Sequence, residues 1–267
     1  MRLKDTRAIG EARQRRFLKR RFSLNLARHM KISVVLTPPE IARLPEADLS
    51  HTTAVVFDVL RATSTMTTAF EQGVTAIYPA KDIEEALYFH KKYPHALLGG
   101  ERHGEKIDGF DLGNSPLEYR NLPGREIIST TTNGTIALRA VAHAPVVIAG
   151  ALLNIRAIAD YLAVNLPSHL LLVCAGTGNE FAIEDGLAAG ALLDALPPFP
   201  MDDAGKMVLS LWKSNAENPW SVLANSQNGS RLIERNRKSE VEWCSQMNTC
   251  TTFGLLDGEA LRPCLAS

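Results

Sequence analysis

The segment 58–65 (DVLRATST) places a carboxylate, a guanidinium and three hydroxyl groups within eight residues. The apolar run AVVF before it predicts a buried strand that ends at Asp58. Thr63 is placed to cap the next helix, whose first N–H groups could receive an oxyanion. Asp58 and Arg61 are therefore catalytic candidates, and Thr63 and Ser64 are candidates for binding an anionic substrate. The simpler alternative is a helix cap with a surface salt bridge.

A glycine-rich stretch at 99–116 is the second candidate segment, with five glycines and little hydrophobic periodicity. Loops of this length in compact domains are usually functional or disordered. Glu101 and Arg102 stand side by side, which suits a metal ligand next to an anion clamp. The alternative is a surface loop closed by its own salt bridge.

A third segment, 129–135 (STTTNGT), follows another predicted strand. Its hydroxyls and the Asn-Gly turn put donors at a helix N-terminus, where an anion could bind. The substrate-binding candidates are Thr131, Thr132, Asn133 and Gly134. No GxxxxGK pattern is present, so the segment is not a Walker P-loop. An ordinary helix cap would need only one of these residues.

Acidic residues are concentrated in the fourth segment, 174–185 (CAGTGNEFAIED). Glu180 and Glu184 are four positions apart, so a helix over 180–195 would place both carboxylates on one face. Together with Asp58 and Asp185 they could form the all-oxygen site that Mg²⁺ prefers. The alternatives are a solvated acidic helix N-terminus and a dinucleotide turn, although the third glycine of that fingerprint is absent.

Alternating strand and helix patterns indicate the elements that must position these segments. Strands are predicted at 31–36, 53–58, 74–78, 96–99, 126–130, 145–149 and 169–174, and helices near 63–72, 82–92, 134–142, 154–165 and 180–195. Apolar strands of this kind are typical of an α/β fold with a largely buried sheet between two helix layers. Because ligands collect at the carboxyl ends of such strands, the four segments should converge. Beyond the Pro-rich stretch 197–200, mostly helical segments are predicted at 202–214 and 219–235, followed by a short section at 251–264.

The charge is distributed unevenly along the 267 residues, although the formal net charge is zero. Residues 1–30 carry ten Lys or Arg against two acidic residues, an excess of eight, so 31–267 carries a net charge of −8. No apolar stretch is long enough to span a bilayer, and the four cysteines form no CxxC pair. A reduced, cytoplasmic protein is expected.

The basic leader, 1–30, is predicted to lie outside the fold, and 31–267 to form one catalytic α/β domain with a mostly helical part from about 200. Two alternatives are a helix docked on the body and a nucleic-acid arm. The leader lacks interleaved aromatic residues, so nucleic acid is not the expected partner. Deleting it should leave folding and activity nearly unchanged.

The four segments, in this order, closely resemble the 2-phosphosulfolactate phosphatase (ComB) family. The motifs that carry the resemblance are VxDVLRATST, GGERxG…GFDxGNSPLEY, TTTNGT and CAGTxxEFxxED, between about Lys31 and Asp194. The resemblance implies a three-layer α/β/α fold with a mixed sheet, a homo-oligomer such as a dimer, and Mg²⁺ as cofactor. It also adds Asp111 and Asn114 to the site. The implied metal ligands come from Asp58, Glu101, Asp111, Glu180, Glu184 and Asp185.

The function expected from both arguments is a Mg²⁺-dependent phosphatase for a small anionic hydroxy acid, with (2R)-2-phospho-3-sulfolactate as the implied substrate. Arg61 and Arg102 would bind the anion as bidentate forks. Either Asp58 attacks phosphorus, or a metal-bound water does so with Asp58 as ligand or base, and the absence of a DxD pair favours water. The alternatives are a non-catalytic dianion-binding protein and a phosphatase of another phospho-hydroxy acid.

Overall fold

The computed structural model describes residues 30–265, and the leader prediction for 1–29 lies outside the described residues. All seven predicted strands are confirmed, as β1, β2, β3, β4, β6, β7 and β8. The ten strands of the described chain are β1 (Lys31–Val35), β2 (Thr52–Phe57), β3 (Ala76–Ala80), β4 (Leu97–Arg102), β5 (Glu105–Lys106), β6 (Glu126–Thr130), β7 (Val146–Gly150), β8 (His169–Cys174), β9 (Thr252–Asp257) and β10 (Ala260–Leu265).

The helices predicted between the strands are also present, with shifted ends. The α-helices within 30–265 are α2 (Pro38–Ile41), α3 (Ala62–Glu71), α4 (Ile83–Lys92), α5 (Gly134–Ala140), α6 (Ile155–Val164), α7 (Ile183–Ala195), α8 (Asp203–Asn215), α9 (Pro219–Asn225), α10 (Gln227–Glu234) and α11 (Lys238–Cys244). The predicted helix 219–235 is interrupted at Ser226, whose hydroxyl accepts a hydrogen bond from the Gly229 N–H and caps α10. The chain therefore turns between α9 and α10.

The strands form one ten-stranded sheet in the order β1-β8-β2-β7-β9-β10-β3-β6-β4-β5. β1, β8, β2 and β7 are parallel to one another, and so are β3, β6 and β4. The β9–β10 hairpin pairs antiparallel with β7 on one side and β3 on the other, and so joins the two parallel blocks. The sheet is mixed for this reason, as the family resemblance implied.

Burial alternates along the central strands, which explains the three layers. Val55 and Phe57 of β2 pack with α6 and α7 on one face, whereas Ala54 and Val56 pack with α3 and α5 on the other. Successive strand residues point to opposite faces, so a strand with every residue apolar must be covered on both sides. The three-layer α/β/α fold is confirmed, with α6 and α7 on one face of the sheet and α3 and α5 on the other.

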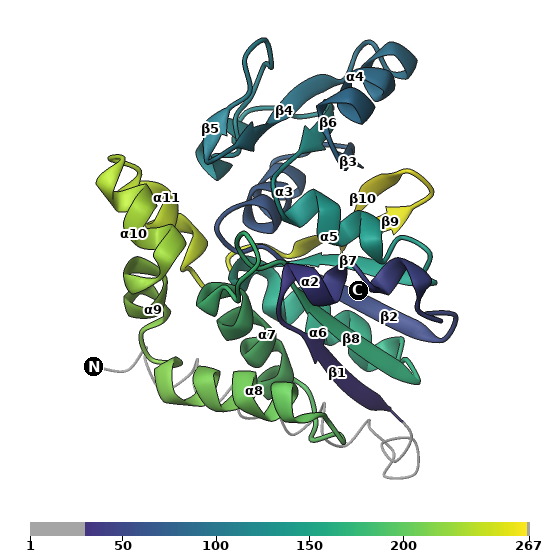
Figure 1. Ribbon diagram of the computed structural model, residues 1–267, viewed down its shortest axis with the longest axis vertical. Helices are drawn as coiled ribbons and strands as arrows, with labels where there is room; N and C mark the ends of the chain where they lie inside the picture. The colour runs from purple at the N-terminus through teal and green to yellow at the C-terminus, as the bar shows by residue number, and fades with distance from the viewer. Residues whose placement is uncertain (1–29, 266–267) are drawn as a thin grey trace, which may run out of the picture.

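The two parallel blocks meet at an angle, and this brings their carboxyl ends together. Three successive antiparallel pairs separate β7 from β3, so in a flat sheet the blocks would point in opposite directions. Five strand-to-strand steps lead from β2 to β6, and a twist of about 20–25° per step turns the second block by roughly 100° or more. The carboxyl ends of β2 and β6 can therefore face one pocket. In Figure 1, β3, β4 and β6 lie across the top of the molecule, above β2, β8 and β1.

Met30 marks the start of the described fold and is buried at 2% exposure in the core. It precedes β1, as expected for the first strand of the domain. No helix in residues 30–265 is long and apolar enough to cross a membrane.

Candidate active site

A pocket of about 460 Å³ opens where β2, β4, β6 and β8 end. Four predicted segments contribute to it, so the expected convergence is observed. The pocket is lined by Asp58, Leu60, Arg61, Glu101, His103, Gly104, Asn114, Thr132, Asn133, Thr177, Gly178, Asn228, Arg231, Leu232 and Arg235.

Asp58 follows β2 directly and is held by the turn into α3. Its Oδ1 accepts a hydrogen bond from the Ala62 N–H at 3.1 Å, and its backbone N–H donates to the Thr63 hydroxyl at 2.9 Å. Gly134, the first residue of α5, packs so closely that a β carbon there would lie 2.6 Å from Asp58 Oδ2. The ends of two strands from different blocks therefore meet at this carboxylate.

The electrostatic surroundings of Asp58 are strongly negative. The pKa of Asp58 is raised to about 7, mainly by burial and also by the charges of Glu101 and Glu184, against the lowering effect of hydrogen bonds from the backbones of Ala62 and Gly134. Close carboxylates cannot all ionise without a compensating cation. A cation bound here would remove that penalty.

Glu101 at the end of β4 joins two loops across the pocket. Its Oε1 accepts from the Thr132 N–H and its Oε2 from the Gly104 N–H, each at 2.7 Å. The side chain is 7% exposed. Glu101 therefore fixes the β4–β5 turn against the loop after β6.

Glu184 and Asp185 lie in the first turn of α7 and are both buried. The Asp185 carboxylate accepts from the Val59 N–H at 2.8 Å and from the Gly176 N–H at 3.0 Å, so it ties together the loops after β2 and β8. Burial raises the pKa of both carboxyl groups, and Glu184 and Asp58 raise that of Asp185 further. These two acids extend the acidic side of the site behind the pocket, where burial favours their protonated form.

Glu180 differs from its prediction. It precedes α7, which begins at Ile183, and its backbone pairs with Thr177 in a tight turn. The side chain is exposed, so Glu180 and Glu184 do not share a helical face. The Thr177–Glu180 turn, with Gly176 and Gly178 at positive φ, delays the start of the helix.

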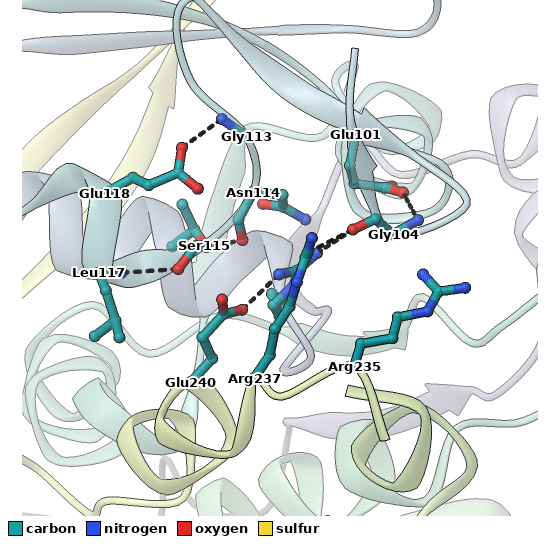
Figure 2. Close-up of polar contacts among 12 residues, drawn as sticks. Glu101, Gly104, Gly113, Asn114, Ser115, Leu117, Glu118, Arg235, Arg237 and Glu240 are labelled. Atoms are coloured by element: carbon teal, nitrogen blue, oxygen red, sulfur yellow. Dashed lines mark hydrogen bonds and ion pairs between the residues drawn. The ribbon is translucent and has the colours of Figure 1, made fainter. Parts of the chain in front are cut away.

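Arg61 is buried at the pocket, as the catalytic prediction requires, but most of its guanidinium is already engaged. It forms an ion pair with Glu240 of α11 and donates to the carbonyl oxygen of Gly104 at 2.9 Å. Arg237 donates to the same carbonyl at 2.7 Å. Figure 2 shows Arg235, Arg237 and Glu240 extending from the C-terminal part of the chain, with Arg237 bonded to Gly104.

Arg102 and Asp111 are not brought to the pocket. Arg102 follows Glu101 in β4 and so points to the other side of the strand. Its guanidinium donates to the Thr130 hydroxyl at 2.9 Å and to the Glu101 carbonyl at 2.7 Å. Asp111 is exposed and accepts a hydrogen bond from the Leu98 N–H near the start of β4. The glycine-rich stretch folds back along β4, which moves Asp111 away from the strand ends.

Several predicted substrate-binding hydroxyls instead hold the backbone. The Thr63 hydroxyl donates to the Asp58 carbonyl and that of Ser64 to the Val59 carbonyl, and both residues are fully buried. Thr131 exchanges hydrogen bonds with Thr135 at the start of α5. These residues stabilise the turns that lead from β2 into α3 and from β6 into α5. Thr132 and Asn133, by contrast, line the pocket.

Asn114 also reaches the pocket, through a loop that internal hydrogen bonds shape. The Gly113 N–H donates to Glu118 at 2.6 Å, and Thr65 of α3 donates to the Asn114 carbonyl at 2.9 Å. The Ser115 hydroxyl caps the short turn that follows, as Figure 2 shows. These hydrogen bonds fix the loop in the conformation that places Asn114 at the pocket.

The largest omission from the sequence analysis is the wall formed by α10. Asn228, Arg231 and Arg235 line the pocket, although each is more than 40 residues from the nearest predicted site residue. The signal that could have identified them is a run of arginines at 231, 235 and 237 in an otherwise acidic body. Their place beside the strand ends depends on how α9, α10 and α11 fold back, which periodicity does not predict.

The predicted six-carboxylate metal set is not assembled. Within residues 30–265 no group of three or more His, Cys, Asp or Glu side chains is arranged to hold a metal ion. Mg²⁺ usually takes only one or two protein carboxylates, with waters and substrate phosphate oxygens completing its shell. Asp58 and Glu101 line the pocket, and the charge of Glu101 adds to burial in raising the pKa of Asp58. This donor pair fits such an ion.

Comparison with known proteins gives consistent matches. Residues 40–258 match the model of the 2-phosphosulpholactate phosphatase family. A probable 2-phosphosulfolactate phosphatase of Carboxydothermus hydrogenoformans is 40% identical over 222 residues, which cover 82% of this chain and 90% of that protein. Proteins of the same description from Caldanaerobacter subterraneus and Thermotoga petrophila are 40% and 38% identical, over 74% and 77% of this chain and 85% and 89% of their own lengths.

The fold, the pocket at the strand ends and these matches define a phosphoric monoester hydrolase. The chain belongs to the 2-phosphosulpholactate phosphatase family, which confirms the resemblance found in the sequence.

Proposed function

We propose that this protein is a Mg²⁺-dependent phosphatase that hydrolyses the phosphate ester of a small anionic hydroxy acid. The substrate we propose is (2R)-2-phospho-3-sulfolactate, which would yield 3-sulfolactate and phosphate. The observation that supports this most directly is the pocket, in which buried acids face a wall of arginines. The names of the relatives support the substrate.

The pocket has two chemically different sides. Asp58 and Glu101 form an acidic side at the ends of β2 and β4, where a divalent cation and a phosphoryl group would neutralise each other's charge. Arg231 and Arg235 form a basic side on α10. A substrate with only a phosphate would use one side, whereas a phosphorylated acid can use both.

Asp58 is the group we expect to move a proton. It lines the pocket at the end of β2, where its carboxylate can accept a proton from a bound water. In the proposed step a water oxygen bonds to phosphorus opposite the ester oxygen, and Asp58 takes the proton that this water releases. The bond between phosphorus and the ester oxygen breaks, and the leaving oxygen takes up a proton from solvent. Thr132 and Asn133 line the pocket where they can orient the phosphoryl oxygens.

Mg²⁺ held by Asp58 and Glu101 would supply positive charge to the phosphoryl oxygens as the transition state forms. Both carboxylates already have backbone donors, so their positions are fixed before any ion binds. Glu184 does not line the pocket; it accepts a hydrogen bond from Asn228 and so helps to hold α10 beside the acidic side.

The cysteines and the family resemblance bear on the compartment and the assembly. All four cysteines are unpaired, which fits a protein that works in the reducing cytoplasm. We also propose a homo-oligomer such as a dimer, because the family resemblance implies it. Size-exclusion chromatography with light scattering measures this directly.

The deciding experiment measures phosphate release from a panel of phosphorylated hydroxy acids, with Mg²⁺ and with excess EDTA. We expect release from 2-phospho-3-sulfolactate in Mg²⁺ and none in EDTA. Tight binding of the same compounds without release would indicate a dianion-binding protein instead. Acid quenching during turnover separates the two routes at phosphorus, because a phosphorylated protein would show that Asp58 attacks directly.

A further inference from the structure

One face of α10 supplies most of the basic side of the pocket. Asn228, Arg231, Leu232 and Arg235 all line it, and their spacing of three, four and seven positions places them on a single helical face. The pocket is therefore lined by a row of side chains from one helical face rather than by one isolated side chain.

Two contacts fix how this face is presented. The Asn228 amide donates to Glu184 Oε1 at 2.7 Å and to the Thr177 hydroxyl at 2.6 Å, which anchors α10 to the acidic side. On the opposite side, a β carbon at Gly229 would clash with the carbonyl oxygen of Leu223 in α9. The helix cannot rotate without breaking one of these contacts.

There are more arginines near this face of α10 than there are carboxylates paired with them. Arg235 and Arg237 both form ion pairs with Glu105. Arg231 lines the pocket with an exposed side chain, and its guanidinium forms no hydrogen bond or ion pair with any group of residues 30–265. Arg235 is thus already compensated by Glu105, whereas the Arg231 guanidinium is left with a charge that an anion in the pocket can neutralise.

That anion is not expected to be the phosphoryl group. The acidic pair Asp58 and Glu101 would bring the cation and the phosphoryl group to the opposite side of the pocket, at the strand ends. We infer that Arg231, supported by Arg235, is a specificity-determining subsite that binds the second acidic group of the substrate, a carboxylate or sulfonate. This inference rests on the proposed function for the place of the phosphoryl group.

The substrate class follows from this division. Phosphate esters that carry a separate carboxylate or sulfonate would engage both sides, whereas plain alkyl phosphates would engage one. A guanidinium fork recognises either acid through two parallel hydrogen bonds. Arg231 therefore takes the role that the sequence analysis gave to Arg102.

The test compares two nearly isosteric substrates, 2-phospholactate and isopropyl phosphate, with wild type and Arg231→Gln. Loss of one charge-assisted contact should raise the KM for 2-phospholactate about tenfold. The kcat/KM for isopropyl phosphate should change by less than about twofold, because that ester has no group to meet Arg231. The matched control is Arg125→Gln, since Arg125 is exposed outside the pocket and its side chain has no partner among the described residues.

Equal losses for both substrates would overturn the inference, because Arg231 would then act on the phosphoryl group or on the fold. Unchanged kinetics for both would overturn it as well. If no ester is hydrolysed, the proposed function fails separately, and calorimetric titration with 3-sulfolactate tests the subsite alone. Weaker binding to Arg231→Gln than to wild type would support the subsite, and equal binding would refute it.

Discussion

Arg61 and Glu240 are 179 residues apart in the sequence and form an ion pair whose side chains are only 4% and 10% exposed. The pair joins the start of α3 to α11. Arg61 and Arg237 also share the Gly104 carbonyl, so the C-terminal helices are fastened to both sides of the pocket entrance. We expect these contacts to hold α10 in its position over the pocket.

We expect Glu240→Ala to destabilise the protein by about 3–5 kcal/mol, because it leaves the Arg61 guanidinium buried without its partner. Denaturant unfolding measures the change. Glu242→Ala is the control, since Glu242 is 53% exposed and pairs only with Lys238 one turn earlier, where the loss should stay below about 1 kcal/mol. Equal losses in the free energy of unfolding for the two substitutions would show that the buried Arg61–Glu240 pair stabilises the fold no more than an exposed pair does.

Mg²⁺ should raise the melting temperature of the wild type, and Asp58→Asn should abolish that rise. Binding to the folded state alone stabilises by about 2.7 kcal/mol when the ion is at about 100 times its Kd. Asp58→Asn should itself fold well, because it removes a carboxylate whose burial is unfavourable.

Asp203→Asn is the matched control for that measurement. Asp203 lies on α8 with its side chain 97% exposed, paired with Lys206. It should keep the full response to Mg²⁺. A response that persists in Asp58→Asn would place the ion elsewhere.

Arg102→Lys should keep kcat/KM within about threefold of wild type, since Arg102 does not line the pocket and its contacts are to Thr130 and a backbone carbonyl. Arg61→Lys should lose far more, because a single ammonium cannot serve both Glu240 and the Gly104 carbonyl in place of the fork. Steady-state kinetics decides. A loss of about thirtyfold or more in kcat/KM for Arg102→Lys would contradict this expectation and support the role of Arg102 as an anion clamp that the sequence analysis predicted.

His169 should make stability depend on pH in the weakly acidic range. Burial and the charge of Lys31 lower the pKa of His169 below its usual 6.5, against an opposing effect of Asp202. As the pH falls through 6.5, the unfolded chain takes up a proton that the folded chain resists, so the free energy of unfolding decreases.

His169→Gln tests this dependence. It removes the hydrogen bonds of the ring with Thr52 and Ser33, so it should be less stable than wild type at pH 7.5. The difference should narrow at pH 5, where only the wild type has lost stability through this group. His51→Gln, at an exposed position, should show a constant difference, and a constant difference in His169→Gln would contradict the assignment.

The sequence predicted the parallel strands well because their runs of apolar residues reflect burial on both faces, a property of local composition. It did not predict β9 and β10, although Asp257-Gly258 at the turn is a recognised hairpin signal. Among the predicted site residues, the structure places Asp58 and Glu101 at the pocket; Asp58 was predicted because it follows a strand, and Glu101 because it stands beside Arg102 in a glycine-rich stretch. Arg102 and Asp111 were misplaced because spacing does not reveal which side of β4 a residue faces or how a glycine-rich loop folds back.

The β9–β10 hairpin has a consequence for how the protein is made. It occupies the middle of the sheet, yet it follows every other strand in the sequence. The edges of β7 and β3 that face it stay unpaired until the hairpin docks, and unpaired edges invite aggregation. Synthesis of β9 and β10 must therefore precede the joining of the two parallel blocks, and nascent chains stalled before β9 should need chaperones.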